Sequence, residues 1–213
     1  MSDKKNNVRV IPTQVKTSDE AENNFRKDMQ LLDDKNFSYE LYGYLQHISY
    51  YDKECDKQFR KVYLEDFSVR KTVEVLKMGN QKVQKHLKYL REIGFITEEK
   101  FEDCYGKYYK LPKLDCSTYT KLDFENKIVK ELFYSCNECA IRMALLYKSY
   151  CDFYGSCCLT PEQVCDKIGL SHQSYSYNKV RTINRMLCEI GVIYMKTIRF
   201  ENGKEKNVYR CNI

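Results

Sequence analysis

Hydrophobic positions recur at helical spacing in several segments of the chain, and turn residues separate these segments. Leu41, Leu45 and Ile48 recur at the three- and four-residue intervals of one helix face. Further along, Thr160 and Pro161 are the N-cap and first-turn residues with which helices often begin. Glycines and short strand-like runs follow the helical patterns. The predicted helices are 39–49, 64–76, 81–93, 140–153, 161–168 and 177–190, and the predicted strands are 95–97, 107–111, 192–200 and 206–211, with a two-residue turn at 202–203.

The order of predicted elements occurs twice because part of the sequence is repeated. Residues 82–96 read KVQKHLKYLREIGFI and residues 179–193 read KVRTINRMLCEIGVI, with seven of fifteen positions identical and no gap. Upstream, the pattern Ser-Tyr-x-Asp occurs at 49–52 and again at 149–152. Two matches in the same order indicate a duplicated unit of about 100 residues, which is too long a period for a solenoid. Chance similarity between two amphipathic helices is the alternative interpretation.

The predicted order of elements resembles the winged helix-turn-helix family of DNA-binding proteins. This order is two helices, a turn, a third helix and a β-hairpin. The sharpest feature is the end of the third helix, Glu-Ile-Gly-Phe-Ile at 92–96 and Glu-Ile-Gly-Val-Ile at 189–193. The resemblance implies a mainly α fold with small β-hairpins (α+β), arranged as two tandem winged-helix domains. We therefore expect a polar, flexible N-terminal arm at 1–36, winged-helix domains at 37–114 and 126–213, and a linker at 115–125.

The third helix of each predicted unit has one apolar face and one polar face. The apolar residues expected in the core are Val83, Leu87, Leu90, Val180, Leu187 and Ile190. No acidic residue occurs within 75–91 or 167–188. Arg and Lys reach guanine or phosphate, and Asn and Gln read adenine, so the polar faces predict contact with double-stranded DNA rather than solubility alone. The candidate DNA-binding residues are Gln81, Lys82, Gln84, Lys85, Lys88, Arg91, Asn178, Lys179, Arg181, Thr182 and Arg185.

The two predicted hairpins differ in charge. The first has a single lysine among the residues Glu98, Glu99, Lys100, Glu102 and Asp103. Because phosphate repels such a hairpin, we expect the first unit to use its helix alone or to serve in dimerisation. The second hairpin also contains two glutamates, but we expect phosphate contacts from its basic residues, which are Arg199, Lys204 and Lys206.

Composition narrows the class of protein further. The net charge of +6 divides into zero for residues 1–36 and +3 for each of the two following segments, too little by itself to indicate a nucleic-acid partner. The chain has eleven cysteines, no apolar run of membrane-spanning length and no export signal, so we expect a cytoplasmic protein with reduced thiols. Cys136 and Cys139 have the spacing of half a zinc site, but we favour buried reduced thiols over a site completed by Cys157, Cys158 or Cys165.

No pattern in the sequence predicts an enzyme, a metal or a cofactor. The histidines His47, His86 and His172 are far apart, and no phosphate-binding loop, GxSxG or Rossmann glycine pattern is present. Tandem winged helices in a chain of this size resemble the initiators of iteron-type plasmid and phage replication. This resemblance implies binding to repeated origin sites, with residues 178–185 as the main base reader, and a homodimer that represses its own promoter. The lack of an apolar run of membrane-spanning length predicts no membrane contact. A transcriptional regulator of the same fold and a protein-interaction module that binds an acidic partner are the alternatives.

Overall fold

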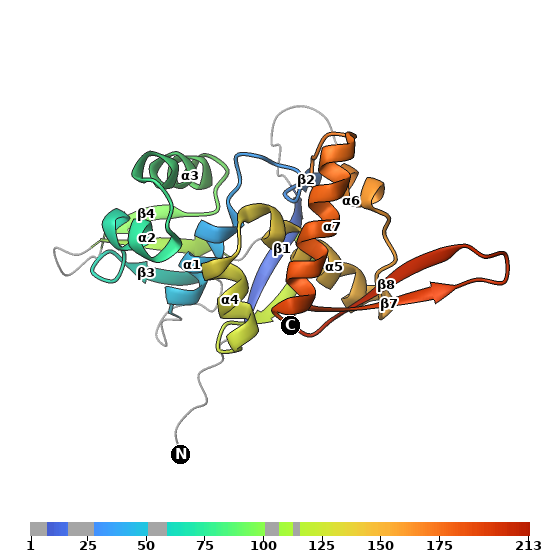
Figure 1. Cartoon of the computed structure of the whole chain (residues 1–213). Coiled ribbons are helices and arrows are strands. Elements are labelled where there is room, and N and C mark those ends of the chain that lie inside the picture. The colour runs from blue at the N-terminus through green and yellow to red at the C-terminus, as the bar shows by residue number, and fades with distance from the viewer. Residues whose placement is uncertain (1–7, 17–27, 51–58, 101–106, 113–115) are drawn as a thin grey trace, which may run out of the picture. The chain divides into compact units, whose positions relative to one another are not determined.

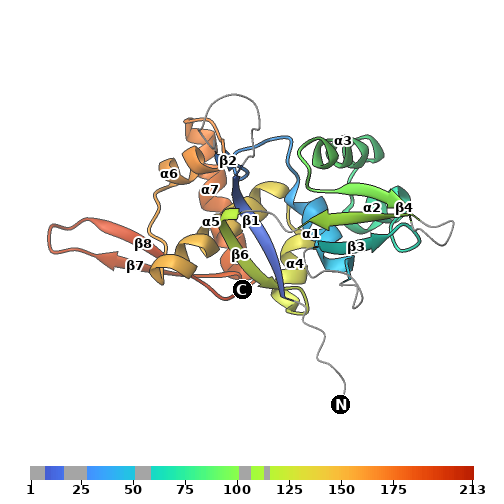
Figure 2. The same cartoon turned by 180° about the vertical axis from the view of Figure 1, so that it is seen from behind.

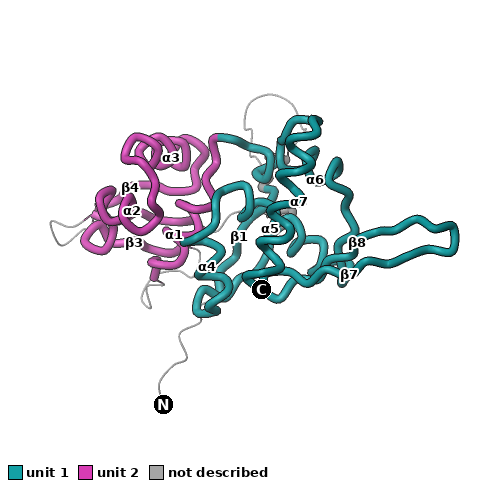
Figure 3. The backbone as a smooth tube through the Cα atoms, viewed as in Figure 1, with its two compact units in different colours: residues 1–35, 116–213 teal, residues 36–115 magenta. Residues whose placement is uncertain are grey.

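The structure is a mixed α+β arrangement of helices and small antiparallel sheets. It divides into two compact units, Asn36–Asp115 (unit 2) and Met1–Lys35 together with Cys116–Ile213 (unit 1) (Figure 3). It is a computed structural model, and it describes residues 8–16, 28–50, 59–100, 107–112 and 116–213.

The described part of unit 2 contains three helices and one antiparallel sheet. Its elements are α1 (Tyr39–Ile48), β3 (Phe59–Tyr63), α2 (Val69–Leu76), α3 (Asn80–Glu92), β4 (Thr97–Lys100) and β5 (Lys107–Pro112). Ser38 and Ser68 begin α1 and α2, because the side-chain oxygen of each accepts a hydrogen bond from a first-turn backbone N–H. The sheet order is β3-β5-β4, so the strand between the first two helices pairs with the last strand of the unit.

Aromatic and aliphatic side chains fill the core of unit 2. Phe37 packs edge to face against Phe95, with ring centroids 5.1 Å apart. Val83, Leu87 and Leu90 of α3 are all buried, as the helical spacing predicted. Burial of this one side fixes α3 against its unit and leaves the opposite side to solvent.

The described residues of unit 1 form four helices, a three-stranded sheet of order β2-β1-β6 and a hairpin. The elements are β1 (Val8–Lys16), β2 (Asp28–Gln30), β6 (Cys116–Asp123), α4 (Lys127–Ser135), α5 (Glu138–Tyr154), α6 (Pro161–Lys167), α7 (Ser174–Glu189), β7 (Ile193–Arg199) and β8 (Glu205–Cys211). Figures 1 and 2 show the β7–β8 hairpin extending beyond the helices of its unit.

Two local signals in unit 1 have different outcomes. Thr160 caps α6 as predicted, within a capping box in which it exchanges hydrogen bonds with Gln163. The hairpin turn is longer than predicted, because the N–H of Gly203 donates to the carbonyl of Phe200 at 2.9 Å. Three residues, 201–203, therefore close the hairpin, and Gly203 takes the left-handed conformation (φ 75°) that such a loop requires.

The part of unit 1 from α5 to β8 repeats the order of elements of unit 2 and part of its strand pairing. Helices α1, α2 and α3 and the β4–β5 hairpin correspond to α5, α6, α7 and the β7–β8 hairpin. Where β3 pairs with β5 in unit 2, Cys157 pairs with Tyr209 of β8 in unit 1 as an isolated antiparallel bridge. A glycine with positive φ follows the third helix in both units, Gly94 at 74° and Gly191 at 79°. The repeat in the sequence thus extends to the connectivity of the two units.

Strands occupy two segments that we expected to be an arm and a linker. β1 lies within 1–36 and β6 within 115–125, and the two strands pair along their length in antiparallel register. Ile11 and Leu122 of this pair are fully buried. The expectation of a flexible arm and linker is wrong for these residues, because each strand pairs with a strand more than 100 residues away in the sequence. Helix α4, which the sequence did not predict, follows β6.

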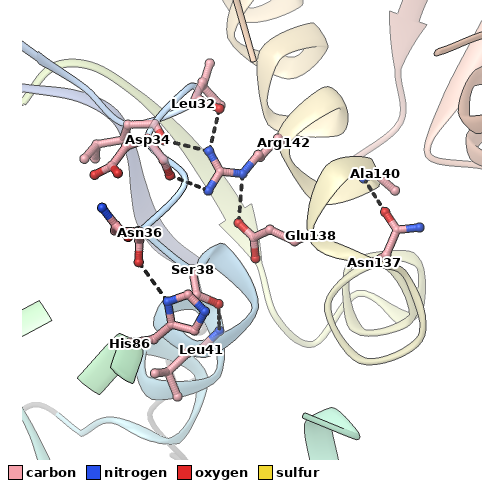
Figure 4. A network of polar contacts seen from close by, with 11 residues as sticks. Leu32, Asp34, Asn36, Ser38, Leu41, His86, Asn137, Glu138, Ala140 and Arg142 are labelled. Carbon is pink, nitrogen blue, oxygen red and sulfur yellow. Dashed lines mark hydrogen bonds and ion pairs between the residues drawn. The ribbon is translucent and has the colours of Figure 1, made fainter. Parts of the chain in front are cut away.

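Arg142 of α5 holds the segment of unit 1 that follows β2 (Figure 4). Its Nε also donates to Oε1 of Glu138 on the same helix at 3.1 Å, and the two side chains form an ion pair. Gly169 lies close to the same segment, where a Cβ atom would be 2.9 Å from the carbonyl oxygen of Asp33. The guanidinium donates to three main-chain carbonyls, those of Leu31 at 3.1 Å, Leu32 at 2.6 Å and Asp34 at 2.7 Å.

Candidate nucleic-acid interface

The outer face of α3 is exposed and carries no acidic residue before the last position of the helix. Lys88 lies 3.7 Å from Glu92, measured between Nζ and Oε1, and both side chains are exposed. Neither Lys82 nor Lys85 makes an ion pair or side-chain hydrogen bond with a described residue. Their charges are therefore not balanced within the described protein. The exposed residues of this face are Gln81, Lys82, Gln84, Lys85 and Lys88.

The outer face of α7 repeats this arrangement at equivalent positions of the duplicated sequence. Asn178, Thr182 and Arg185 occupy the places of Gln81, Lys85 and Lys88, and all three are exposed. Nη1 of Arg181 donates to Oδ1 of Asn178 at 3.0 Å, which pre-positions a guanidinium beside an amide. Arg185 makes no such contact within the described part of the chain. The sequence-predicted residues of α7 are thus brought together, with one exception.

That exception is Lys179, and Arg91 of α3 behaves similarly. Lys179 is half-buried, and its hydrogen bond to Cys139 opposes the rise in pKa that burial causes for that thiol. Nη2 of Arg91 donates to the hydroxyl of Tyr109 at 2.8 Å, and its guanidinium lies 5.4 Å from the centre of that ring. Both residues lie at the border between the two helix faces, so the structure directs them to partners in their own units.

A buried polar network fixes α7 in unit 1. The hydroxyl of Tyr147 donates to Oδ1 of Asn184 at 2.8 Å, and Nδ2 of Asn184 donates to the hydroxyl of Tyr209 at 3.0 Å. The two tyrosine rings are stacked, with centroids 4.9 Å apart. Asn184 takes the place of Leu87 in the duplicated sequence. Because Asn184 is polar, the pattern of apolar residues alone did not assign it to the inner face. The network joins α7 to α5 and to the hairpin.

The register of β7 and β8 divides the second hairpin into two faces. On one face Arg199 is paired with Glu205, with Nε 2.8 Å from Oε1. Its charge is therefore partly balanced within the hairpin, and its phosphate contact stays a prediction. The opposite face, here called the cationic hairpin face, has no acidic residue and consists of Tyr194, Lys196, Ile198, Lys206, Val208 and Arg210.

Sequence reasoning found only Lys206 on the cationic hairpin face. It missed Lys196 and Arg210 because assigning side chains to a face requires the strand register. Lys204 is exposed beside the turn. Tyr194 is 60% exposed and Ile198 is 41% exposed, so this face combines cations with apolar surface.

The described part of the first hairpin is balanced rather than acidic. Oε1 of Glu98 lies 2.8 Å from Nζ of Lys107, and Oε1 of Glu99 lies 3.2 Å from Nζ of Lys110. The hydrogen bond from Lys107 lowers the pKa of Glu98, and one from the Tyr108 hydroxyl lowers the pKa of Glu99. The repulsion of phosphate that we expected from these two carboxylates is therefore offset by β5. Glu102 and Asp103 lie outside the described residues.

Metal-ligating side chains do not gather in the described part of the chain. No group of three or more His, Cys, Asp or Glu side chains there surrounds a common point. Cys136 and Cys139 are accordingly not joined by further described ligands. His86 of α3 is 7% exposed, and its Nδ1 lies 2.8 Å from the carbonyl oxygen of Asn36 (Figure 4), which gives this ring a role in packing.

No protein-family model matches the chain, and no curated protein matches it. None of the helices in the described ranges is both long and apolar enough to cross a membrane. The fold and the candidate site therefore define a mixed α+β protein with two units of shared connectivity, each of which exposes a helix face rich in cations, amides or hydroxyls.

Proposed function

We propose that the protein binds double-stranded DNA through the outer faces of α3 and α7. The order helix, strand or bridge, helix, helix, hairpin supports a winged-helix fold for both units, as does the pairing of the first strand with the last. In such a fold the third helix is the element that enters the major groove. The observation that carries the proposal is that Lys82, Lys85 and Arg185 occupy these faces with no balancing partner among the described residues.

Unit 1 offers DNA a larger contact surface than α7 alone, because the β7–β8 hairpin follows that helix. Gly191 lies between α7 and β7, and Nδ2 of Asn184 in α7 donates to the hydroxyl of Tyr209 in β8, so the helix and the hairpin are joined by the chain and by a buried hydrogen bond. Lys196, Lys206 and Arg210 provide three cations on the cationic hairpin face, without an acid among them. Phosphate neutralisation by such residues supplies sequence-independent affinity, while the α7 side chains read bases.

The proposed biological role is initiation of replication at repeated origin sites of a plasmid or phage. It rests on the resemblance to iteron-type initiators and on the presence of two similar candidate readers in one chain. A transcriptional regulator uses the same DNA contacts. The two roles are separated by supplying the protein in trans to a plasmid that carries only the neighbouring non-coding DNA. Maintenance of that plasmid supports an initiator, and its loss supports a regulator.

DNA binding itself is tested by selecting bound duplexes from a random pool and measuring their affinity at several salt concentrations. The double variant Lys82→Ala/Lys85→Ala is expected to reduce the slope of log affinity against log salt by about 1.8, since each phosphate contact contributes about 0.9. Arg185→Ala is expected to weaken the selected sequence more than random DNA.

Arg70→Ala is the matched control, because Arg70 is an exposed cation of α2 that pairs with Glu74 at 3.3 Å. It should leave both affinity and salt slope unchanged. Absence of DNA binding at low salt contradicts the proposal and favours a protein-interaction module. An unchanged salt slope in the Lys82/Lys85 variant removes α3 from the interface.

A further inference from the structure

A cavity of about 470 Å³ lies within unit 1, and none of its lining residues belongs to the proposed DNA-binding faces. Its walls come from β1 and β2, from the segment that follows β2, and from α5 and α6. Ligand cavities in proteins commonly measure about 300–1,000 Å³, so this one can take a small molecule. The lining residues that matter most for its chemistry are Thr13, Leu32, Asp33, Leu146, Tyr150 and Lys167.

The part of the wall that follows β2 is fixed in position by its neighbours. The guanidinium of Arg142 in α5 donates to the main-chain carbonyls of Leu32 and Asp34 (Figure 4). Gly169, which follows α6, lies so close that a Cβ atom there would be 2.9 Å from the carbonyl oxygen of Asp33. Asp33 is therefore carried by a segment that is bound to α5 and lies against the end of α6. Walls held in this way form the cavity before a ligand arrives.

The lining carries one negative and one positive charge that have no ionic partner in the described ranges. Asp33 is exposed, and its carboxylate makes no ion pair or hydrogen bond with a described residue. Nζ of Lys167 lies 5.6 Å from the centre of the Tyr150 ring, which positions the ammonium without neutralising it. The third charged residue of the lining is Asp166, whose Oδ1 lies 2.5 Å from Nε2 of His172. A ligand in the cavity therefore meets one unpaired anion and one unpaired cation.

The buried members of the lining give the cavity a largely apolar interior. They are Leu32, Leu146 and Thr13, whereas Asp33 and Lys167 are exposed. Oγ1 of Thr13 is buried and has no hydrogen-bond partner among the described residues, so it adds one polar atom to this interior. The cavity thus combines an apolar interior with two opposite charges at the surface of the protein, an arrangement that orients a ligand carrying both charges.

We propose that the cavity binds a small zwitterion, either a free amino acid or a dipeptide. The ammonium group of the ligand lies against the carboxylate of Asp33, and its carboxylate lies against the ammonium of Lys167. Other charge classes fit less well, because an anion such as a phosphate meets Asp33 and a cation such as a polyamine meets Lys167. A neutral ligand covers both charges without pairing either of them. Amino acids and dipeptides differ in the separation of their charged ends, and the experiment includes both.

The test uses the full-length chain and two pools of probes, the common free amino acids and dipeptides that contain glycine. Saturation-transfer NMR at millimolar concentration identifies the binders, and calorimetry measures their affinities. For the tightest binder, the matching amine without the carboxylate and the matching acid without the amine are measured as well. Each analogue should bind about tenfold more weakly than the zwitterion, because each has lost one charge-assisted hydrogen bond.

Two variants assign the ends of the ligand to the two charges. Asp33→Asn should weaken binding of the zwitterion and of the amine by about tenfold but leave binding of the acid no weaker. Lys167→Gln should weaken binding of the zwitterion and of the acid by about tenfold but leave binding of the amine no weaker. Glu162→Gln is the matched control, because Glu162 is an exposed residue of α6 that does not line the cavity. Far-UV circular dichroism confirms that each variant is folded.

Failure of both pools to bind at millimolar concentration overturns the proposal. Binding that Asp33→Asn and Lys167→Gln leave unchanged also overturns it, as does tighter binding of the amine or the acid than of the zwitterion. Binding confined to one pool supports the proposal and identifies the source of the ligand. None of these measurements involves DNA, so the outcome does not depend on whether the protein binds DNA.

Discussion

Replacement of Arg142 by lysine tests whether its guanidinium holds the segment after β2 in unit 1. The side chain is 8% exposed, and its three nitrogens donate to three main-chain carbonyls and to Glu138. Lysine keeps the positive charge but has a single nitrogen, which cannot reach acceptors arranged around a planar fork. Because a single arginine nitrogen serves at most two of the four acceptors, Arg142→Lys leaves at least two of them without their donor.

The expected loss follows from the cost of buried polar groups without partners. Each costs about 1–2 kcal/mol, so the free energy of unfolding of unit 1 should fall by about 2–4 kcal/mol. Arg70→Lys is the control, because Arg70 also pairs with a glutamate four residues away, but its side chain is 91% exposed. Exposed ion pairs of this spacing contribute at most about 0.5 kcal/mol, so the control should change the free energy of unfolding by no more than that amount.

Urea unfolding followed by circular dichroism gives the overall change, and hydrogen exchange of peptides from α5 reports on unit 1 alone. The separate readout is needed because two compact units need not unfold together. A loss of about 2–4 kcal/mol corresponds to exchange faster by about 30- to 900-fold in α5. If Arg142→Lys exchanges no faster than Arg70→Lys, the carbonyl contacts do not stabilise the unit and the reasoning is refuted.

Two further outcomes follow from local geometry and charge. Gly169→Ala should destabilise unit 1 by about 2–3 kcal/mol in thermal unfolding, because φ is +68° and the new Cβ would meet the Asp33 carbonyl oxygen. Gly203→Ala is the control, with φ +75° and open space around the new Cβ, and should cost only about 1 kcal/mol. Equal losses in the two variants would show that the close approach to Asp33 does not matter. Because the folded-state pKa values of Glu98 and Glu99 lie below the ordinary value of 4.5, their stabilisation of unit 2 is present above that pH and is lost as the pH falls through the lowered values. Glu98→Gln/Glu99→Gln should therefore flatten the acid limb of a plot of urea midpoint against pH, and an unchanged limb would exclude these carboxylates as its source.

The helices were predictable from the sequence because their signals are local. The predicted helix at 39–49 is α1 at Tyr39–Ile48, and the one at 81–93 is α3 at Asn80–Glu92. Caps and terminal glycines lie within a few residues of the helices that they limit. The second helix was predicted too long at its start, because residues 64–66 form a turn after β3 and α2 begins only at Val69.

The missed elements depend on partners that are distant in the sequence. β1 pairs with β6, and the two strands are not joined by a short turn whose residues could have predicted the pairing. β3 contains Arg60 and Lys61, which are both buried, so its sequence does not alternate between apolar and polar residues as an exposed strand does. The same limit applies to the candidate site: helix periodicity placed the faces of α3 and α7, whereas the cationic hairpin face required the strand register.

The duplication preserved geometry more strictly than chemistry, and this bears on how two readers would divide their work. Inside the units, Leu87 and Asn184 occupy the same position and are both buried, because Asn184 finds two tyrosine hydroxyls in place of apolar contacts. Outside, the central position of the proposed reading face is Lys85 in α3 and Thr182 in α7. A lysine there favours guanine or phosphate, while a threonine accepts either a hydrogen-bonding base edge or the thymine methyl group. Two units of one chain that both read bases should therefore select different half-sites. Identical half-sites in the selected DNA would instead indicate that the same unit from two chains is bound to each site.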